Sequence, residues 1–324
     1  MVTAHCRLPE THVVEGAFAS LLGAADASGR VVVLSRQPNV YTSTSLSEII
    51  RCELPDGREL ELFCKYGAPR AGDSYGHQGG VPYEVLVYRH VLDPLKSSVP
   101  TFFGAYIDAP GGRTWLVIEH VAGSLRMSRT ADPLAMPHAA RWIGEFHRRH
   151  EDRTADDEMS FLTRYDFAFY EGWARRTERF AASLRSRYPW LSSLCEGFPQ
   201  LIPALMAAPS TIIHGECYPE NILVRDGAVY PVDWESAAIA AGEIDLASLT
   251  ERWSKEVAEQ CELAYRSARW PQGFPHYDAD RTLAIAQLYL HLRWLGDRPE
   301  RTIARNSRWR FAALRSLGEQ IGVI

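Results

Sequence analysis

The first third of the chain alternates short apolar runs with turn residues, a pattern typical of an antiparallel sheet. Runs that predict strands cover residues 31–34, 48–54, 59–66, 102–106 and 115–120. Pro55, Asp56 and Gly57 form a strong turn between the second run and the third. Helical spacing over residues 14–25 and 81–92 predicts two helices in the same region.

Beyond Asp132 the apolar spacing becomes helical. Helices are expected over residues 137–149, 161–188, 194–206, 243–269, 280–294 and 307–320. Three short apolar runs interrupt this pattern, at residues 212–213, 222–224 and 229–232, and Asp226-Gly227 predicts a tight turn between the last two. The pattern therefore predicts an α+β chain with a small antiparallel-sheet domain, residues 1–118, and a larger helical domain, residues 119–324.

Composition narrows the class of protein. The chain has 324 residues, 46% of them hydrophobic and 23% charged, as in ordinary globular proteins. Its net charge of −5 gives no basis for binding nucleic acid. No apolar run approaches the roughly 20 residues that span a membrane, and no signal peptide is recognisable. We therefore expect a cytoplasmic protein that binds neither nucleic acid nor a membrane, while nothing in the sequence indicates an oligomeric state.

Six cysteines are scattered along the chain without a C-x-x-C pair. They lie in apolar or periodic surroundings, which favours reduced core thiols over disulfides or zinc ligands.

Residues that carry chemistry gather in and after the loop between the runs 212–213 and 222–224. His214 is followed by Glu216, and Asn221 comes five residues after the acid. Asp233 ends the strand after the hairpin. The acid would orient a substrate hydroxyl, while Asn221 and Asp233 would supply oxygen ligands to Mg²⁺.

This spacing resembles the catalytic loop of protein kinases, H-x-D-x-x-x-x-N, followed by a metal-binding Asp after a hairpin. The closer resemblance is to the aminoglycoside phosphotransferase and choline kinase superfamily, because His-Gly precedes the acid, Asn-Ile-Leu-Val follows it, and Asp-Trp-Glu stands at residues 233–235. It extends over about residues 31–249. The resemblance implies a protein-kinase-like two-lobed fold that uses ATP and Mg²⁺ to phosphorylate a small hydroxylated molecule.

The acid departs from the family pattern, because Glu216 stands where Asp is usual. The extra methylene would move the carboxylate by roughly 1 Å on an unchanged backbone, and a misplacement of that size can cost about 10²-fold in rate. The other elements of the resemblance are intact, so we expect an active enzyme in which Glu216, His214 and Lys65 form the catalytic set. His214 is expected to fix the loop backbone without titrating.

Lys65, at the end of the third predicted strand, is expected to contact the α- and β-phosphates, as the resemblance implies. Phe63 on the same strand face would cover the adenine. Glu84 lies inside the apolar stripe of the following helix, where a carboxylate requires a partner. Lys65 is the partner that the resemblance assigns to it, although a lysine at a strand end is most often simply solvated.

Two more segments would contact the nucleotide. The loop where kinases place glycines contains hydroxyls able to donate to phosphate oxygens, namely Ser43, Thr44 and Ser45. A solvated turn is the alternative. After the last strand, the Glu119 carbonyl and the Val121 N–H would bind adenine, and Ile118 would line the back of its pocket. The alternative there is a strand that ends at a glycine turn.

Two residues outside the loop are expected to support it. The resemblance implies that Asp245 braces the loop through buried hydrogen bonds, and the alternative is a solvent-facing helix cap. His147, on a helix stripe, is interpreted as a structural core residue.

The sequence thus supports an ATP-dependent kinase of a small hydroxylated molecule, such as an antibiotic, an aminoglycoside-like compound or another natural product, acting in resistance or biosynthesis. Two alternatives stay open: a non-catalytic ATP-binding scaffold, and an enzyme of this fold that transfers AMP. The choice between ATP and GTP depends on backbone contacts that side chains do not reveal.

Overall fold

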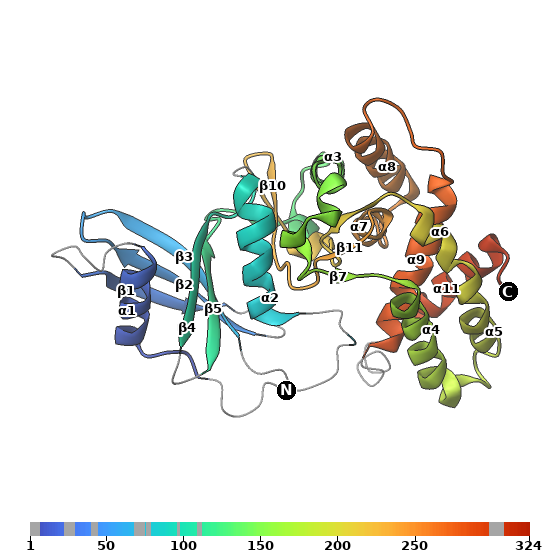
Figure 1. Cartoon of the computed structure of the whole chain (residues 1–324), viewed down its shortest axis with the longest axis horizontal. Coiled ribbons are helices and arrows are strands. Elements are labelled where there is room, and N and C mark those ends of the chain that lie inside the picture. Colours follow the sequence, from blue (N-terminus) through green and yellow to red (C-terminus); the bar gives the residue numbers. More distant parts are fainter. Residues whose placement is uncertain are drawn as a thin grey trace. The chain divides into compact units, whose positions relative to one another are not determined.

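The computed structural model describes residues 7–22, 30–39, 45–67, 75, 79–95, 98–108, 112–297 and 308–324. The chain forms two compact units, which are considered separately (Figure 1). The first unit contains Met1–Leu125 and Leu223–Ser236, and the second contains Arg126–Ile222 and Ala237–Ile324. These units differ from a single division at residue 118, because residues 223–236 fold with the first unit.

A five-stranded sheet in the order β1-β2-β3-β5-β4 forms the core of the first unit, and every neighbouring pair is antiparallel. Its strands are β1 (Val32–Pro38), β2 (Leu46–Glu53), β3 (Glu59–Tyr66), β4 (Phe102–Asp108) and β5 (Arg113–Glu119). All five predicted strands are therefore present. Gly57 closes the β2–β3 turn at φ 82°, a conformation that glycine adopts without strain.

Period-two alternation on β3 separates the apolar core from the chemistry. Leu62 and Cys64 are buried in one apolar cluster with Val14 and Phe18 of helix α1 (Thr11–Leu21), which lies beside the sheet in Figure 1. Lys65 follows Cys64 and therefore points to the opposite face of the sheet. The strand thus presents one face to a core and the other to the polar site described below.

The helix expected over residues 81–92 is α2 (Gly80–Val87), continued by one π-helical turn, Tyr88–Leu92. The wider turn still buries Tyr88, Val91 and Leu92, so the predicted apolar stripe is confirmed. Glu84 is 2% exposed on that stripe.

Helices dominate the second unit. They are α3 (Ala135–His150), α4 (Phe167–Ala181), α5 (Trp190–Gly197), α6 (Ile202–Ala207), α7 (Glu243–Leu249), α8 (Lys255–Arg269), α9 (Ala279–Gly296) and α11 (Arg308–Ile321). Helix α3 packs against α8, while α9 packs against α4, α7 and α11. The sequence predicted these helices but not all of their ends.

Three predicted helices are interrupted or shortened. The helix expected from residue 161 begins at Phe167, because the Asp166 carboxylate caps it by accepting from the Phe169 N–H at 2.8 Å. The helix expected over residues 243–269 breaks after Leu249, and Ser254 caps the second part, α8. A 3₁₀ turn, Phe198–Gln200, separates α5 from α6.

Short strands complete the structure. In the second unit, β11 (Ala238–Ala241) lies between β8 (Ser210–Ile213), antiparallel to it, and β7 (Thr163–Arg164), parallel to it. The strands β9 (Ile222–Arg225) and β10 (Ala228–Pro231) form the predicted hairpin, and with β6 (Leu125–Arg126) they form a sheet in the order β10-β9-β6. Asp226 and Gly227, at φ 51° and 76°, make the two-residue turn. Strand β11 was not predicted.

Within the parts of the chain just described, no helix combines the length and the apolar character needed to cross a membrane.

Candidate functional site

Lys65 lies at the centre of a buried ionic cluster in the first unit. Its Nζ is 2.8 Å from Oε2 of Glu84, and the two residues are 8% and 2% exposed. The predicted pair between strand β3 and helix α2 is therefore confirmed. Because an uncompensated carboxylate on this helix face would be costly, Lys65 is what permits Glu84 to lie there.

The segment after strand β10 brings two more carboxylates to the same ammonium group. Lys65 Nζ is 2.5 Å from Asp233 Oδ1 and 3.9 Å from Glu235 Oε2. The Trp234 N–H donates to Glu84 Oε1 at 3.1 Å. Residues 233–235 are thus fixed to Lys65 and Glu84, although they lie about half the chain away in sequence.

Charge is unbalanced in this cluster, because three carboxylates surround one ammonium group. Burial alone would lower the pKa of Lys65, but the carboxylates, Asp233 foremost, raise that pKa well above its ordinary value. Burial raises the pKa of Glu84 to about 7, against the opposing effect of Lys65. The excess negative charge favours binding of a further cation.

Asp233 is the carboxylate of the cluster that a ligand can reach. Its side chain is 35% exposed, whereas those of Glu84 and Glu235 are each 2% exposed. Its backbone has φ 68°, in the left-handed region that non-glycine residues rarely adopt and that Asp tolerates better than most. Strained residues of this kind concentrate at functional sites.

In the second unit, Asp245 of α7 braces the loop that carries His214 and Glu216. Its carboxylate accepts from the backbone N–H of His214 at 2.7 Å and of Gly215 at 2.9 Å. Asp245 is 1% exposed, so these bonds are shielded from water. The predicted brace is confirmed, and the alternative of a solvent-facing helix cap is wrong.

A buried polar chain continues from Asp245 to α8. His147 Nε2 lies 3.1 Å from the Asp245 carboxylate, and Nδ1 lies 3.0 Å from the Tyr265 hydroxyl, to which Arg269 donates at 2.5 Å. These partners assign the tautomer in which Nε2–H donates to Asp245 and Nδ1 accepts from Tyr265. Burial lowers the pKa of His147, which agrees with a neutral ring and with its predicted structural role.

Gly242 leaves the space that this polar chain occupies. A Cβ at residue 242 would lie 2.3 Å from Arg269 Nη1, 2.4 Å from the Tyr265 hydroxyl and 2.6 Å from His147 Nδ1. Any side chain there would therefore displace the groups that support Asp245.

The loop is also closed by its own side chains. His214 Nδ1 accepts from the Glu216 N–H at 3.3 Å, which agrees with the expected role of His214 in fixing the backbone. Asn221 Nδ2 donates to the Glu216 carbonyl at 3.0 Å. This bond identifies which end of the Asn221 amide is nitrogen, so Oδ1 is the end that can ligate a cation.

Arg293 of α9 is a site residue that the sequence interpretation missed. Its Nη1 is 3.3 Å from Glu216 Oε1, and its Nη2 donates to the Tyr218 hydroxyl at 2.9 Å. The Trp294 Nε1–H donates to the same hydroxyl at 2.5 Å. A signal existed, because Arg293 is the one charged residue in the apolar run 283–295, where a cation requires a partner.

The predicted contacts with the nucleotide, including that of Lys65, all stay predictions. Phe63 lies opposite Ile118 in the β3–β5 register, so these two residues are neighbours in the sheet. The Glu119 carboxylate accepts from the Thr101 hydroxyl at 2.9 Å, and Val121 is buried. Of the hydroxyl loop, Ser45 precedes β2, whereas Ser43 and Thr44 lie outside the described residues.

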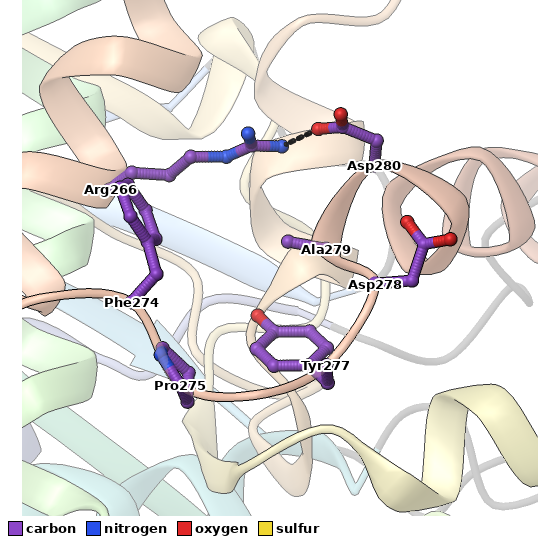
Figure 2. Close-up of a pocket in the computed structure, with 7 residues that line it drawn as sticks. All are labelled: Arg266, Phe274, Pro275, Tyr277, Asp278, Ala279 and Asp280. Carbon is purple, nitrogen blue, oxygen red and sulfur yellow. Dashed lines mark hydrogen bonds and ion pairs between the residues drawn. The ribbon is translucent and has the colours of Figure 1, made fainter.

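A cavity of about 240 Å³ lies in the second unit around the turn between α8 and α9. Figure 2 shows its lining side chains, with Arg266 bound to Asp280 at 2.5 Å. None of the residues that line this cavity is one of the predicted site residues.

Comparison with known proteins gives a family match over residues 83–283, more than half of the chain, to the phosphotransferase enzyme family (APH). No curated protein sequence matches the chain.

Solved structures show the same fold at low sequence identity. The chain is similar to a choline/ethanolamine kinase family protein from Mesorhizobium loti, with 16% identity, 97% of each chain covered and a TM-score of 0.61. Choline kinase from Cryptosporidium parvum Iowa II gives 13% identity, coverage of 97% and 98%, and a TM-score of 0.62. The GDP complex of wild-type aminoglycoside 2'-phosphotransferase-IIIa gives 14% identity, coverage of 97% of this chain and 99% of that chain, and a TM-score of 0.62. The predicted α+β, kinase-like fold is confirmed.

Proposed function

Because this chain belongs to the phosphotransferase enzyme family, we propose that it transfers the γ-phosphoryl group of ATP to a hydroxyl of a small molecule, with Mg²⁺ as cofactor. The observation that carries this proposal is the contact of one buried lysine, Lys65, with both Glu84 and Asp233. A lysine held in this way is suited to contact nucleotide phosphates, and Asp233 is suited to ligate a metal ion.

The residues fit a magnesium ion in their chemistry. Mg²⁺ prefers oxygen ligands and commonly takes only one or two carboxylates from the protein, together with phosphate oxygens. The half-exposed Asp233 carboxylate and the amide oxygen of Asn221 are ligands of this kind. In the described part of the chain no group of three or more His, Cys, Asp and Glu side chains could hold a metal ion, so a cage made of protein ligands alone is not proposed there.

Each side chain would have a defined task during transfer. Lys65 would offset charge on the α- and β-phosphates. Glu216 would accept a hydrogen bond from the acceptor hydroxyl and so direct the oxygen of that hydroxyl at the γ-phosphorus. Bound Mg²⁺ would neutralise charge on the β- and γ-phosphates. Because phosphoryl transfer needs positioning and charge stabilisation more than covalent help, the braced loop is suited to this reaction.

Support for the nucleotide and the acceptor comes from proteins of the same fold. Among the similar structures, aminoglycoside 2'-phosphotransferase-IIIa is a complex with GDP, and LicA is a complex with AMP. Others are choline kinases and a macrolide 2'-phosphotransferase. We infer that this chain also binds a purine nucleotide and phosphorylates a compact or antibiotic-like alcohol.

The test is Mg²⁺-dependent ADP formation with the purified protein over a panel of choline, aminoglycosides, macrolides and simple polyols. Steady ADP production with at least one acceptor is expected, and Glu216→Ala and Asp233→Asn should each lower kcat by 10²-fold or more. Glu319→Gln and Asp56→Asn, on exposed surface, are the matched controls.

Two outcomes would contradict this function. Nucleotide binding without turnover on any acceptor would identify a scaffold. A product labelled with AMP would identify a nucleotidyl transferase.

A further inference from the structure

Arg293 is a buried cation whose guanidinium faces the proposed catalytic acid. Its side chain is 3% exposed, and that of Glu216 is 15% exposed. The two charged groups approach to 3.3 Å from different elements, helix α9 and the loop after β8. A guanidinium this deep in the protein is stable only with polar partners around it.

Another acid that acts on Tyr218, Glu251, is engaged with a different arginine. Glu251 binds Arg310 through both of its oxygens, at 2.7 and 3.2 Å, and lies 3.8 Å from His291 Nδ1. Arg293 is thus bonded to Glu216, whereas Glu251 binds Arg310.

Arg293 holds the loop at two points. Besides the Glu216 carboxylate, it binds the hydroxyl of Tyr218, two residues further along, and Trp294 donates to that same hydroxyl. The Tyr218 N–H in turn donates to the Glu216 carbonyl at 2.7 Å. These contacts fix both ends of the Glu216 residue, its backbone from within the loop and its carboxylate from α9.

Side-chain length matters for this contact. Nη1 lies 3.3 Å from Glu216 Oε1, near the upper limit for a charge-assisted hydrogen bond. An aspartate on the same backbone would withdraw its carboxylate by roughly 1 Å, which would break the bond. Glutamate is thus the acid whose length matches an arginine at residue 293.

We propose that Arg293 is a positioning residue that acts through Glu216, and that the two form a matched pair in place of the shorter acid usual in the family. The inference rests on the proposed function, since it assigns Glu216 the acceptor hydroxyl. Arg293 itself is not assigned any contact with substrate.

The experiment measures kcat and nucleotide KM for ADP release from Mg·ATP, with the best acceptor of the alcohol panel and with water. Arg293→Met should lower kcat by about 10- to 100-fold and change nucleotide KM by less than about threefold, because the acid is displaced while the nucleotide contacts stay. Arg293→Lys, which keeps the charge, should recover part of that loss. Glu216→Asp should lower kcat by about 10- to 100-fold.

A double-mutant cycle separates action through Glu216 from a general effect. In the Glu216→Gln background, Arg293→Met should lower kcat by no more than about threefold. Arg266→Met on α8, another helical arginine paired with an acid, is the control and should leave kcat unchanged. The proposal would be overturned if the kcat of the double variant fell by the product of the two single losses. It would also be overturned if Arg293→Met kept full kcat per folded molecule.

Failure of the proposed function can be told apart from failure of this inference, because the wild-type protein would then turn over no acceptor. If the wild type turns over no acceptor, or if Arg293→Met does not fold, the pair is tested by the same cycle on the unfolding equilibrium, with Arg293→Lys and Glu216→Gln. A coupling of about fivefold or more is expected for groups in contact. Independent effects would show that Arg293 does not act through Glu216.

Discussion

Lys65 carries one positive charge among three carboxylates, and two of its neighbours, Glu84 and Glu235, are almost completely buried. Removing one partner of a buried ion pair leaves an uncompensated charge, which costs more than the pair itself contributes. At the scale of the residue, the site therefore depends on mutual compensation, and single substitutions in it should affect folding as well as catalysis.

Lys65→Met should lower the free energy of unfolding by about 3 kcal/mol or more, because Glu84 loses its cation. Denaturant unfolding at neutral pH measures the change. Lys65→Met with Glu84→Gln removes both charges and should recover part of that stability. A double variant as unstable as the sum of the two single variants would show that the two groups are not coupled.

The buried His150 should make the protein less stable in acid. It is 1% exposed, its Nδ1 donates to the Phe146 carbonyl at 2.7 Å, and burial lowers its pKa to about 4. The unfolded chain, with a pKa near 6.5, binds the proton first, so stability is complete above about pH 6.5 and decreases as the pH falls toward 4. This histidine alone should remove about 2 kcal/mol between pH 7 and pH 5.

His150→Gln keeps a hydrogen-bond donor but does not titrate. Its unfolding free energy should therefore fall by about 2 kcal/mol less than that of the wild type between pH 7 and pH 5. Urea unfolding at pH 7 and pH 5 provides the comparison. Parallel pH curves for the two proteins would contradict the assignment. The buried His147 and His291 should maintain some acid sensitivity in both proteins, because burial lowers their pKa as well.

At the scale of elements, α3, α7 and α8 support the loop that carries His214 and Glu216, through His147, Asp245, Tyr265 and Arg269. The supporting groups come from three helices, and they meet at Gly242, the residue that precedes α7. The position of the loop is therefore determined by helix packing behind it, and a change with no contact to substrate should still alter activity.

Gly242→Ala should destabilise the protein by about 1–3 kcal/mol and lower kcat, because its Cβ would overlap the Tyr265 hydroxyl and its neighbours. Thermal unfolding and ADP release measure the two effects. Gly16→Ala in α1 is the matched control, since a Cβ there meets nothing within 4 Å and alanine favours a helix. Equal effects of the two substitutions would contradict the role of Gly242.

The elements also show why the sequence predicted some helices and strands correctly and missed others. Strand β3 was predicted with its observed bounds, because polar and apolar residues alternate over Glu59–Tyr66. Strand β11 was missed because its residues, Ala238–Ala241, are mostly alanine, which has low β-propensity, and all four are buried by tertiary packing. The break after Leu249 was missed for a similar reason, since apolar spacing continues through it.

Some contacts between distant parts of the chain could be predicted from the sequence, and others could not. Lys65 with Glu84, and Asp245 with the loop, could be proposed because a family resemblance supplied the pairing. Arg293 is 77 residues from Glu216 in sequence, and no local pattern connects them. Only the folded chain shows which acid a buried arginine contacts.

At the scale of the molecule, ligand binding should stabilise the fold as a whole. At a Mg·ATP concentration of 100 times Kd, the free energy of unfolding should rise by about 2.7 kcal/mol. EDTA should remove most of this gain, because ATP without the metal leaves the excess negative charge around Asp233 uncompensated. Thermal melts with ATP, with and without Mg²⁺, give the measurement.

Asp233→Asn should lose the magnesium-dependent part of that gain, while Asp56→Asn should retain it. A shift of the same size with and without Mg²⁺ in the wild type would exclude the proposed metal role of Asp233.

The discontinuity of the first unit has a consequence for biosynthesis. Leu223–Ser236 belongs to this unit, yet the ribosome makes the whole of residues 126–222 before it. Until Asp233 and Glu235 leave the exit tunnel, Lys65 of the nascent chain has only Glu84, of its three acids, within reach. Domains generally fold in the order in which they are translated. Here the five-stranded sheet is complete within residues 32–119, but the ionic cluster stays incomplete until the carboxyl-terminal unit is well under way, so a stalled or truncated message would release a sheet whose Lys65 lacks Asp233 and Glu235.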